Sequence, residues 1–293
     1  MKQKKNPRFR FSGSIDMEII RRQVKRHRRS VLGQWTIRIV VAAMIVTGTY
    51  LVIENQTYTS VATADSHKKD TEDSNQYIAF SDGVIRYSRD GVVFLNKRNK
   101  EKWIQPCQIQ NPIVDVNEDV FAIADVGGNT IMIFQKSGLK GEIETTLPIE
   151  KISVSNQGIV SAILKNESTP QIISYDAVGN ILVEHQVNLN STGYPISLDM
   201  SADGENLMVS YLSTKNGTLK SMVAFYNFGK EGQEKTDNLI YTEDFEQTVV
   251  PDVFYMDAST SVAVGDRSFV IYEGTKSVKK KTEVKLNQEI RSE

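Results

Sequence analysis

The pattern of hydrophobic and polar positions divides the chain into four parts. A basic, polar region reaches Gln34, and an almost unbroken hydrophobic run follows from Trp35 to Ile53. A polar stretch with no apolar period comes next, and from Tyr77 onward short hydrophobic runs recur with a period of two. The pattern predicts a tail over 1–34, an apolar helix over 35–53, a stalk over 54–76 and a domain of short strands over 77–293.

The hydrophobic run has the length of one transmembrane helix. Its 19 residues are interrupted only by Arg38, and about 20 apolar residues cross the ~30 Å of hydrocarbon in a bilayer. Arg38 lies within one turn of the start, where its long side chain can reach the headgroups. Trp35 and Tyr50 lie near the two ends, as interfacial aromatic residues do. We therefore expect Trp35 to Ile53 to cross a membrane.

The charge distribution predicts which side of the membrane each part occupies. Residues 1–38 hold twelve Lys and Arg against two acidic residues, whereas residues 54–293 hold 23 against 34. Basic residues next to a span keep their side in the cytoplasm. We expect a single-pass protein of the cell membrane with a cytoplasmic tail that attracts anionic lipid and an extracytoplasmic C-terminal domain.

Two other interpretations of the N-terminal region stay open. Ala62 and Ala64 have the A-x-A spacing of a cleavage site, although the preceding basic region is long for an export signal. The basic residues of 21–29 could form a nucleic-acid hook, but no base-reading fold accompanies them, so nucleic acid is not an expected partner. The Thr-, Ser-, Asp- and Lys-rich stretch 54–76 is typical of a flexible stalk.

The domain over 77–293 repeats one hairpin. Turn residues separate β-prone runs at Asp90-Gly91, Gly127-Gly128, Asn216-Gly217 and Gly265-Asp266. Such pairs are a strong hairpin signal, and we expect Gly128 and Gly217 to take positive φ. The residues that end the second strand of each unit are spaced by 39, 41, 51 and 46 positions; they are Leu95, Phe134, Tyr175, Tyr226 and Tyr272.

A second marker keeps the same phase, because a proline opens each new unit, at Pro112, Pro148, Pro195 and Pro251. Units of ~40 to 50 residues with about four strands each are typical of propeller blades. A β-sandwich also spaces short strands regularly, but it does not repeat one unit in phase. The sequence therefore predicts an all-β fold, a degenerate β-propeller of about five blade-like units.

Two segments resemble known propeller repeats. SADGENLMVSY (201–211) is similar to the S-x-D-G-x-x-L-x-V-x element of many bacterial propellers, and GVVFLNKRNKEKW (91–103) resembles the Trp-closed blade ending of quinoprotein-type repeats. The whole layout resembles an uncharacterised family of Gram-positive bacterial membrane proteins, the domain of unknown function number 5711. The resemblance implies a membrane-anchored propeller and brings no assigned activity.

The end of the chain bears on closure of the ring. Residues 289–293, EIRSE, look like the start of a further unit. We expect C-terminal blades to be missing from this chain, unless the strand around Tyr77 to Phe80 reaches across to close the ring.

Candidate chemistry is sparse. Cys107 has no disulfide partner and is interpreted as a packed small side chain. The histidines form no metal-ligand pair; they are His27, His67 and His185. A weak calcium-loop pattern consists of Asp199, Asp203 and Glu205. An ordinary turn at Asp203-Gly204 is the favoured interpretation, and we expect no cofactor.

No sequence motif indicates catalysis. The chain shows no G-x-S-x-G, no phosphate-binding loop and no nucleophile with a neighbouring base. We therefore expect a binding or scaffold module of the bacterial cell envelope, for a protein, peptide or glycan. The alternative is a propeller enzyme that acts on an envelope glycan or peptide.

Overall fold

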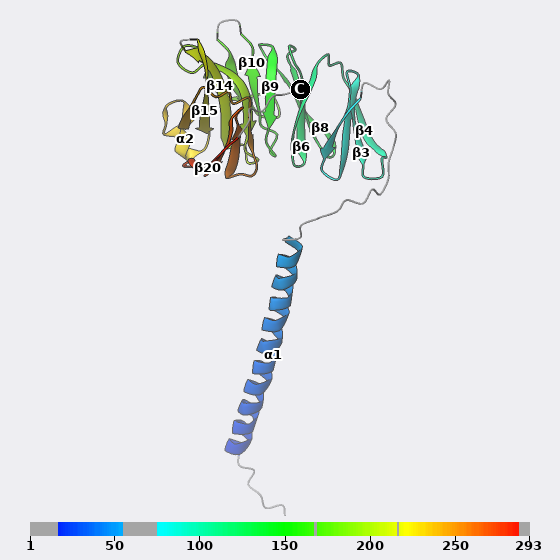
Figure 1. The fold of residues 1–293 in the computed structure, drawn as a ribbon. Coiled ribbons are helices and arrows are strands. Elements are labelled where there is room, and N and C mark those ends of the chain that lie inside the picture. The colour runs from blue at the N-terminus through cyan, green and yellow to red at the C-terminus, as the bar shows by residue number, and fades with distance from the viewer. Residues whose placement is uncertain (1–16, 55–74, 167–168, 216, 287–293) are drawn as a thin grey trace, which may run out of the picture. The chain divides into compact units, whose positions relative to one another are not determined.

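A computed structural model describes residues 17–54, 75–166, 169–215 and 217–286. The chain divides into two units, which are described separately (Figure 1). The first unit contains one helix, and the second contains the β-sheets. The predicted stalk falls almost entirely outside the described residues.

Helix α1 (Met17–Glu54) is 38 residues long. It begins earlier than the predicted 35–53, because no proline interrupts the basic sequence before the apolar run. Within it, Leu32–Ile53 is long and apolar enough to cross a membrane, and none of this segment is buried. The Arg38 guanidinium lies 5.8 Å from the centre of the Trp35 ring, so the one charged side chain of the predicted span has an aromatic partner.

Among its described residues, the second unit contains five antiparallel four-stranded sheets, each built from four consecutive strands. The first sheet contains β1 (Gln76–Phe80), β2 (Gly83–Tyr87), β3 (Gly91–Asn96) and β4 (Glu101–Pro106). The second contains β5 (Pro112–Asn117), β6 (Val120–Asp125), β7 (Thr130–Gln135) and β8 (Gly138–Glu144). The third contains β9 (Ile149–Val154), β10 (Val160–Leu164), β11 (Gln171–Tyr175) and β12 (Ile181–Gln186).

The fourth sheet contains β13 (Tyr194–Met200), β14 (Asn206–Lys215), β15 (Thr218–Asn227) and β16 (Leu239–Glu246). The fifth contains β17 (Asp252–Tyr255), β18 (Thr260–Val264), β19 (Ser268–Glu273) and β20 (Lys279–Lys285). Five such sheets confirm the predicted all-β, propeller-like fold with five blades.

The periodic residues of the sequence coincide with a repeated irregularity of the sheets. In every sheet the register between the third and fourth strands shifts at one point: Phe94/Leu95, Ile133/Phe134, Ser174/Tyr175, Phe225/Tyr226 and Ile271/Tyr272. The second residue of each pair is the one that marked the end of each unit in the sequence. A bulge increases local twist, so this position bends the outermost strand the same way in each blade.

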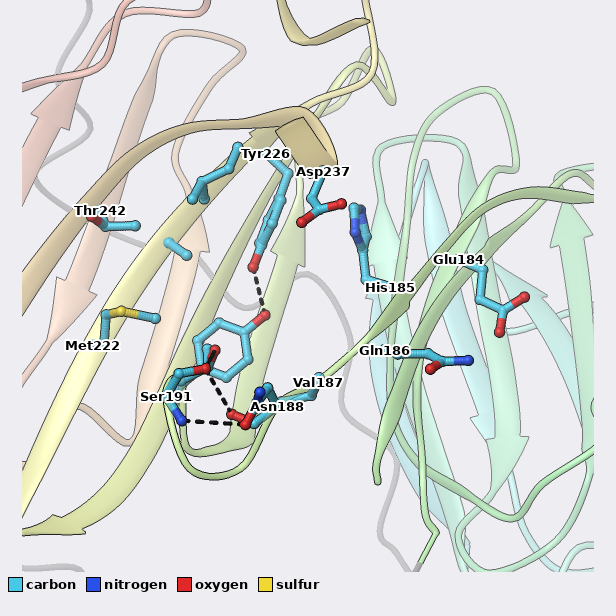
Figure 2. A pocket seen from close by; sticks show the side chains of 14 residues that line it. Glu184, His185, Gln186, Val187, Asn188, Ser191, Met222, Tyr226, Asp237 and Thr242 are labelled. Atoms are coloured by element: carbon cyan, nitrogen blue, oxygen red, sulfur yellow. Dashed lines mark hydrogen bonds between the residues drawn. The ribbon is translucent and has the colours of Figure 1, made fainter. Parts of the chain in front are cut away.

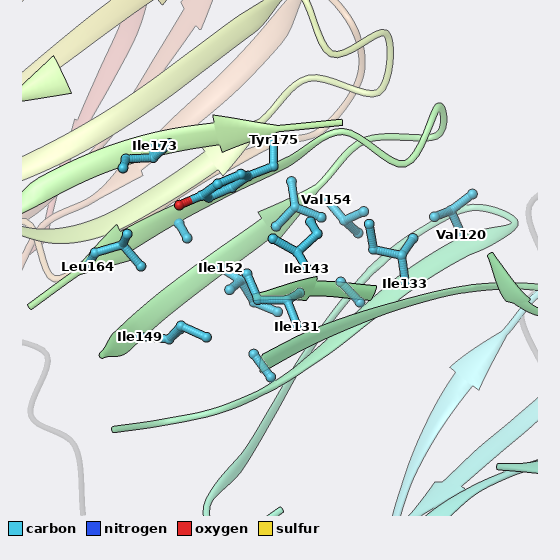
Figure 3. Close-up of a cluster of buried hydrophobic side chains, with 14 residues drawn as sticks. Val120, Ile131, Ile133, Ile143, Ile149, Ile152, Val154, Leu164, Ile173 and Tyr175 are labelled. Carbon is cyan, nitrogen blue, oxygen red and sulfur yellow. The ribbon is translucent and has the colours of Figure 1, made fainter. Parts of the chain in front are cut away.

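Four clusters of buried hydrophobic side chains lie between consecutive sheets. Successive residues of β6 point into different clusters. Phe121 and Ile123 face the first sheet, whereas Ala122 and Ala124 face the third. The cluster between the second and third sheets is almost wholly aliphatic (Figure 3). This double burial explains why the central strands are apolar at nearly every position.

Trp103 joins the first two sheets. Its ring stacks on Phe134 and Phe121 of the second sheet, with centroids 5.3 and 6.4 Å away. Its indole N–H donates a hydrogen bond to the Lys136 carbonyl oxygen at 3.1 Å. The ring also contacts Phe94 of its own sheet, with centroids 6.0 Å apart, so the tryptophan that ends the quinoprotein-like segment packs on both its own blade and the next.

The structure extends and corrects the predicted turns. All four predicted hairpins are present, and a fifth, between β10 and β11, was missed because residues 165–170 contain no glycine. The expected positive φ at Gly128 is wrong: Gly127 carries it, at φ 83°. Gly217 has the expected positive φ of 78°. Residues 228–238 were not predicted to be helical, yet they contain two short helical turns.

Closure of the ring is only partly described. Residues 289–293 lie outside the described residues, so the predicted loss of C-terminal blades stays a prediction. Tyr77 to Phe80 belong to β1, which pairs with β2, so this strand does not extend the fifth sheet. Within the described residues, none of the four clusters joins the fifth sheet to the first.

Replacing Gly127 by Val should destabilise the propeller by about 1–3 kcal/mol, because a β-branched residue is strained at positive φ. A Cβ added there meets nothing within 4 Å, so the cost is conformational rather than steric. Urea unfolding of the detergent-solubilised chain, followed by fluorescence, measures it. Gly48→Val in α1, where a Cβ also meets nothing, is the matched control and should leave propeller unfolding unchanged. Equal losses in both variants would contradict the assignment of this turn.

Candidate functional site

The fourth sheet carries an insertion between its third and fourth strands. Residues 228–238 hold the short helices α2 (Lys230–Gln233) and η1 (Thr236–Asn238), whereas the same connection in the other sheets has at most five residues. The insertion reaches the outermost strand of the third sheet, because Phe228 lies 6.2 Å from the His185 ring of β12. The regular blade pattern is therefore interrupted where the third and fourth sheets meet.

A cleft of about 700 Å³ opens beside this insertion, between β12 and the fourth sheet (Figure 2). Its floor is formed by β14 and β15 through Tyr211, Met222, Ala224 and Tyr226. Uncharged polar residues lie around it; they are Gln186, Asn188, Ser191, Thr192 and Thr242. Volumes of this size are typical of sites for small molecules.

Two tyrosines are locked together at the floor of the cleft. The Tyr211 and Tyr226 hydroxyls lie 2.8 Å apart and form a buried hydrogen bond. Burial raises the pKa of both phenols, so both are neutral at physiological pH. In this pair one hydroxyl donates and the other accepts, so each oxygen has a partner.

His185 forms one wall of the cleft. Its ring faces Tyr226 (Figure 2), with centroids 4.8 Å apart. Its Nε2 atom is buried and has no hydrogen-bond partner among the described residues. Burial lowers the pKa of His185, although the nearby Asp237 carboxylate opposes the shift. The imidazole is therefore neutral at pH 7.

Asp237 stands on the insertion at the mouth of the cleft, and its carboxylate points toward His185 (Figure 2). Asp237 and Asn238 both have left-handed backbone conformations, at φ 55° and 58°. Each such residue costs about 1–3 kcal/mol, and strain of this kind gathers at functional sites. The fold thus holds this one carboxylate in place at an energetic cost.

A second hollow, of about 510 Å³, lies on the other side of the insertion and includes Asp203 and Glu205. Asp203 caps a turn: its Oδ1 accepts the Glu205 N–H at 3.0 Å and the Ser201 hydroxyl at 2.5 Å. Gly204 has φ 73°. These contacts are those of an Asx turn.

Asp199, the third residue of the calcium pattern, belongs to a different network. Its Oδ1 accepts the Ser153 hydroxyl at 2.8 Å and its Oδ2 accepts the Tyr255 N–H at 2.6 Å. In the same way the Asp115 carboxylate accepts the Val154 N–H at 2.6 Å. These bonds connect the first strands of the last four sheets.

Two residues of the weak calcium pattern therefore have different contacts: Asp199 bonds neighbouring blades, and Asp203 shapes a turn. Among the described residues, no group of three or more His, Cys, Asp or Glu could hold a metal ion. Burial raises the pKa of Asp199 to about 6, and the negative charge of Asp115 adds to the shift. Burial likewise raises the pKa of Asp115.

Cys107 is half-buried and packs against the cluster between the first and second sheets. Burial and the Asp90 carboxylate raise the pKa of its thiol. A thiol with a raised pKa is a poor nucleophile at neutral pH, which agrees with its interpretation as a packed side chain.

The cleft residues were not predicted from the sequence. His185, Tyr226 and Asp237 belong to three separate segments, and no motif joins them. The only available signal was the unit spacing of 46 from Tyr226 to Tyr272, which contains residues 228–238 and exceeds the first two spacings of 39 and 41. Extra length in a repeat indicates an insertion, which repeat proteins often place on a binding face.

Comparison with protein families matches residues 54–293 to a family of unknown function, DUF5711. The chain belongs to this family. Comparison with curated protein sequences gave no match.

Several solved structures resemble the chain. Hydrazine synthase of Kuenenia stuttgartiensis has a TM-score of 0.51 at 13% identity, with 78% of this chain and 72% of that chain covered. Hsv2 of Kluyveromyces lactis has a TM-score of 0.50 at 8% identity, with 72% and 73% covered. The WD40 domain of Neurospora crassa Pan2 has a TM-score of 0.48 at 13% identity, with 70% of this chain covered, and the chain spans 63% of that domain. At these identities the first two support the propeller fold alone.

The raised pKa of Asp199 predicts a pH-dependent stability. The folded state holds the proton more tightly than the unfolded chain, so the contribution of Asp199 is greatest below pH 4 and is lost as pH rises through about 6. A shift of this size corresponds to about 3 kcal/mol. In urea titrations, the difference in unfolding free energy between wild type and Asp199→Asn should therefore fall by about this amount between pH 4 and pH 7.

Asp257→Asn provides a control of opposite sign, because hydrogen bonds from Ser259 and Thr260 lower the pKa of Asp257. Its contribution should be lost as pH falls, not as it rises. If the difference in unfolding free energy between wild type and Asp199→Asn stayed constant with pH, the buried-carboxylate account would be contradicted.

Proposed function

We propose that this protein is a single-pass membrane protein of a Gram-positive bacterial cell envelope whose extracytoplasmic propeller binds a ligand in the cleft beside residues 228–238. The observation that carries the proposal is the cleft itself. It lies where the blade pattern is interrupted, and it combines a neutral, unpartnered His185 nitrogen with the strained Asp237. Concave sites with a few placed polar groups are the usual binding sites of propellers and other folds.

The properties of α1 support the membrane anchor. The apolar side chains of Leu32–Ile53 are exposed all round the helix, for example Ile37 at 65% and Val52 at 64%. An unburied apolar helix of this length is stable in lipid rather than in water. Thr49 donates its hydroxyl to the Ile45 carbonyl at 2.9 Å, which satisfies its polar atom within the helix.

The charge distribution supports the orientation. The basic residues precede the apolar helix and the acidic excess follows it, as expected for a cytoplasmic tail and an exported domain. Exposed basic residues at Arg21 and Lys25 lie on the helical extension before the apolar segment. There they would attract anionic lipid on the cytoplasmic side.

One cross-linking experiment tests location and binding together. In a Cys107→Ala background, Ser191→Cys at the edge of the cleft is treated in intact cells with a membrane-impermeant maleimide–benzophenone and then irradiated. We expect labelling without lysis, followed by a specific cross-linked adduct. Val178→Cys, at a site 75% exposed on the β11–β12 turn, should be labelled equally and give no such adduct.

Ser14→Cys in the N-terminal tail completes the set and should be labelled only after lysis. Labelling of Ser14→Cys but not of Val178→Cys in intact cells would overturn the orientation. Labelling of both propeller sites with identical adduct patterns, or with none, would overturn binding at the cleft.

A further inference from the structure

The charges around the cleft restrict what it can bind. No Lys or Arg lies among the residues that line it. Glu184 borders the cleft, but its side chain points away from Tyr226 (Figure 2), and its charge acts on Tyr175 on the opposite side of the third sheet. Asp237 is therefore the acidic group directed into the cleft, and His185 is neutral. This combination repels phosphate, sulfate and carboxylate groups, because their charge would be uncompensated next to Asp237.

The remaining polar groups are matched to hydroxyls. Ser191, Thr192 and Thr242 offer hydroxyls that both donate and accept hydrogen bonds, and Asn188 offers an amide. The Ser191 hydroxyl already makes two long hydrogen bonds, to the Asn188 carbonyl at 3.5 Å and to the Thr192 hydroxyl at 3.4 Å. The Asn188 Oδ1 already accepts the Asn190 and Ser191 N–H groups, at 3.0 and 3.4 Å. Its NH₂ group is therefore the part that can turn to a ligand. A ligand with many hydroxyls can satisfy such a mixed set, whereas an apolar ligand would leave it unpaired.

The apolar part of the cleft completes the pattern. Met222 and Leu239 contribute apolar surface beside the polar residues, and Leu239 is 37% exposed. A pyranose ring has an apolar C–H face and a rim of hydroxyls, so it can pack on this surface while its rim meets the polar groups. The two oxygens of the Asp237 carboxylate can accept hydrogen bonds from two adjacent hydroxyls of one ring.

We infer that the cleft binds a saccharide without acidic groups, with Asp237 as its main hydrogen-bond acceptor. The inference names the ligand class of the proposed binding function and rests on it. It does not depend on which side of the membrane the propeller occupies. The two left-handed residues at 237 and 238 hold the carboxylate at the mouth before the ligand arrives, which reduces the ordering cost of binding.

The test is isothermal titration of the full chain in detergent with three probes: chitotetraose, tetragalacturonate and tetra-alanine. We expect chitotetraose to bind and the other two to show no binding. Asp237→Asn should weaken chitotetraose binding at least fivefold, and Asn retains the tolerance for left-handed φ, so the insertion should keep its shape. Glu234→Gln removes an exposed acid of the same insertion that does not line the cleft, and should change affinity less than twofold.

Thr242→Trp gives an independent steric test, because this exposed residue of the edge strand β16 lines the cleft. It should abolish binding while urea unfolding stays within the range of the wild type. Tighter binding of tetragalacturonate or tetra-alanine, or equal effects of Asp237→Asn and Glu234→Gln, would overturn the inference. If chitotetraose fails while the Ser191→Cys cross-link still forms in cells, the saccharide class is wrong and the binding function stands.

Discussion

Each four-stranded sheet of this propeller has two apolar faces, and each face needs a neighbouring sheet to exclude water. The alternation of Phe121 and Ile123 with Ala122 and Ala124 along β6 shows how one strand serves two interfaces. No blade could bury its side chains alone, so the repeat is stable only as a series. The large rings follow the same rule, since Trp103 of the first sheet completes its packing on Phe134 of the second.

Hydrogen bonds join the first strands of neighbouring sheets. Asp115, Ser153 and Asp199 each accept a backbone N–H of the next sheet, which fixes the inner strands at a constant spacing. The outermost strand β12 alternates exposed and half-buried residues and has no continuous apolar face. The third and fourth sheets therefore diverge outward, and the insertion at 228–238 enters this space instead of closing it. The cleft follows from the same geometry that builds the blades.

Much of the fold could be predicted because it depends on local signals. Turn glycines, period-two runs and the phase of Pro112 and its counterparts are visible in the sequence and specify strands and hairpins. The positive φ was misplaced by one residue, at Gly128 instead of Gly127, because adjacent glycines fit either position. The β10–β11 hairpin was missed because its connection contains no glycine.

The site could not be predicted for a physical reason. His185 and Asp237 meet only through packing of β12 against an insertion in the following blade, and neither residue has a neighbour in sequence that signals the contact. Asp199 was judged by its resemblance to a metal loop, whereas its burial between blades decides its role. Local sequence patterns predict strands and turns, whereas the cleft and the role of Asp199 depend on contacts between strands that are distant in sequence.

The central claim is that the described sheets form a series joined by four hydrophobic clusters, so the middle three sheets each contribute to two clusters and the first and fifth to one each. Native-state hydrogen exchange of the full chain tests it most directly. The amides of β10–β11 and β14–β15 should open only with the largest free energies, and those of β2–β3 and β18–β19 with smaller ones. Equal protection in all five sheets, or greater protection in the first and fifth, would contradict the account.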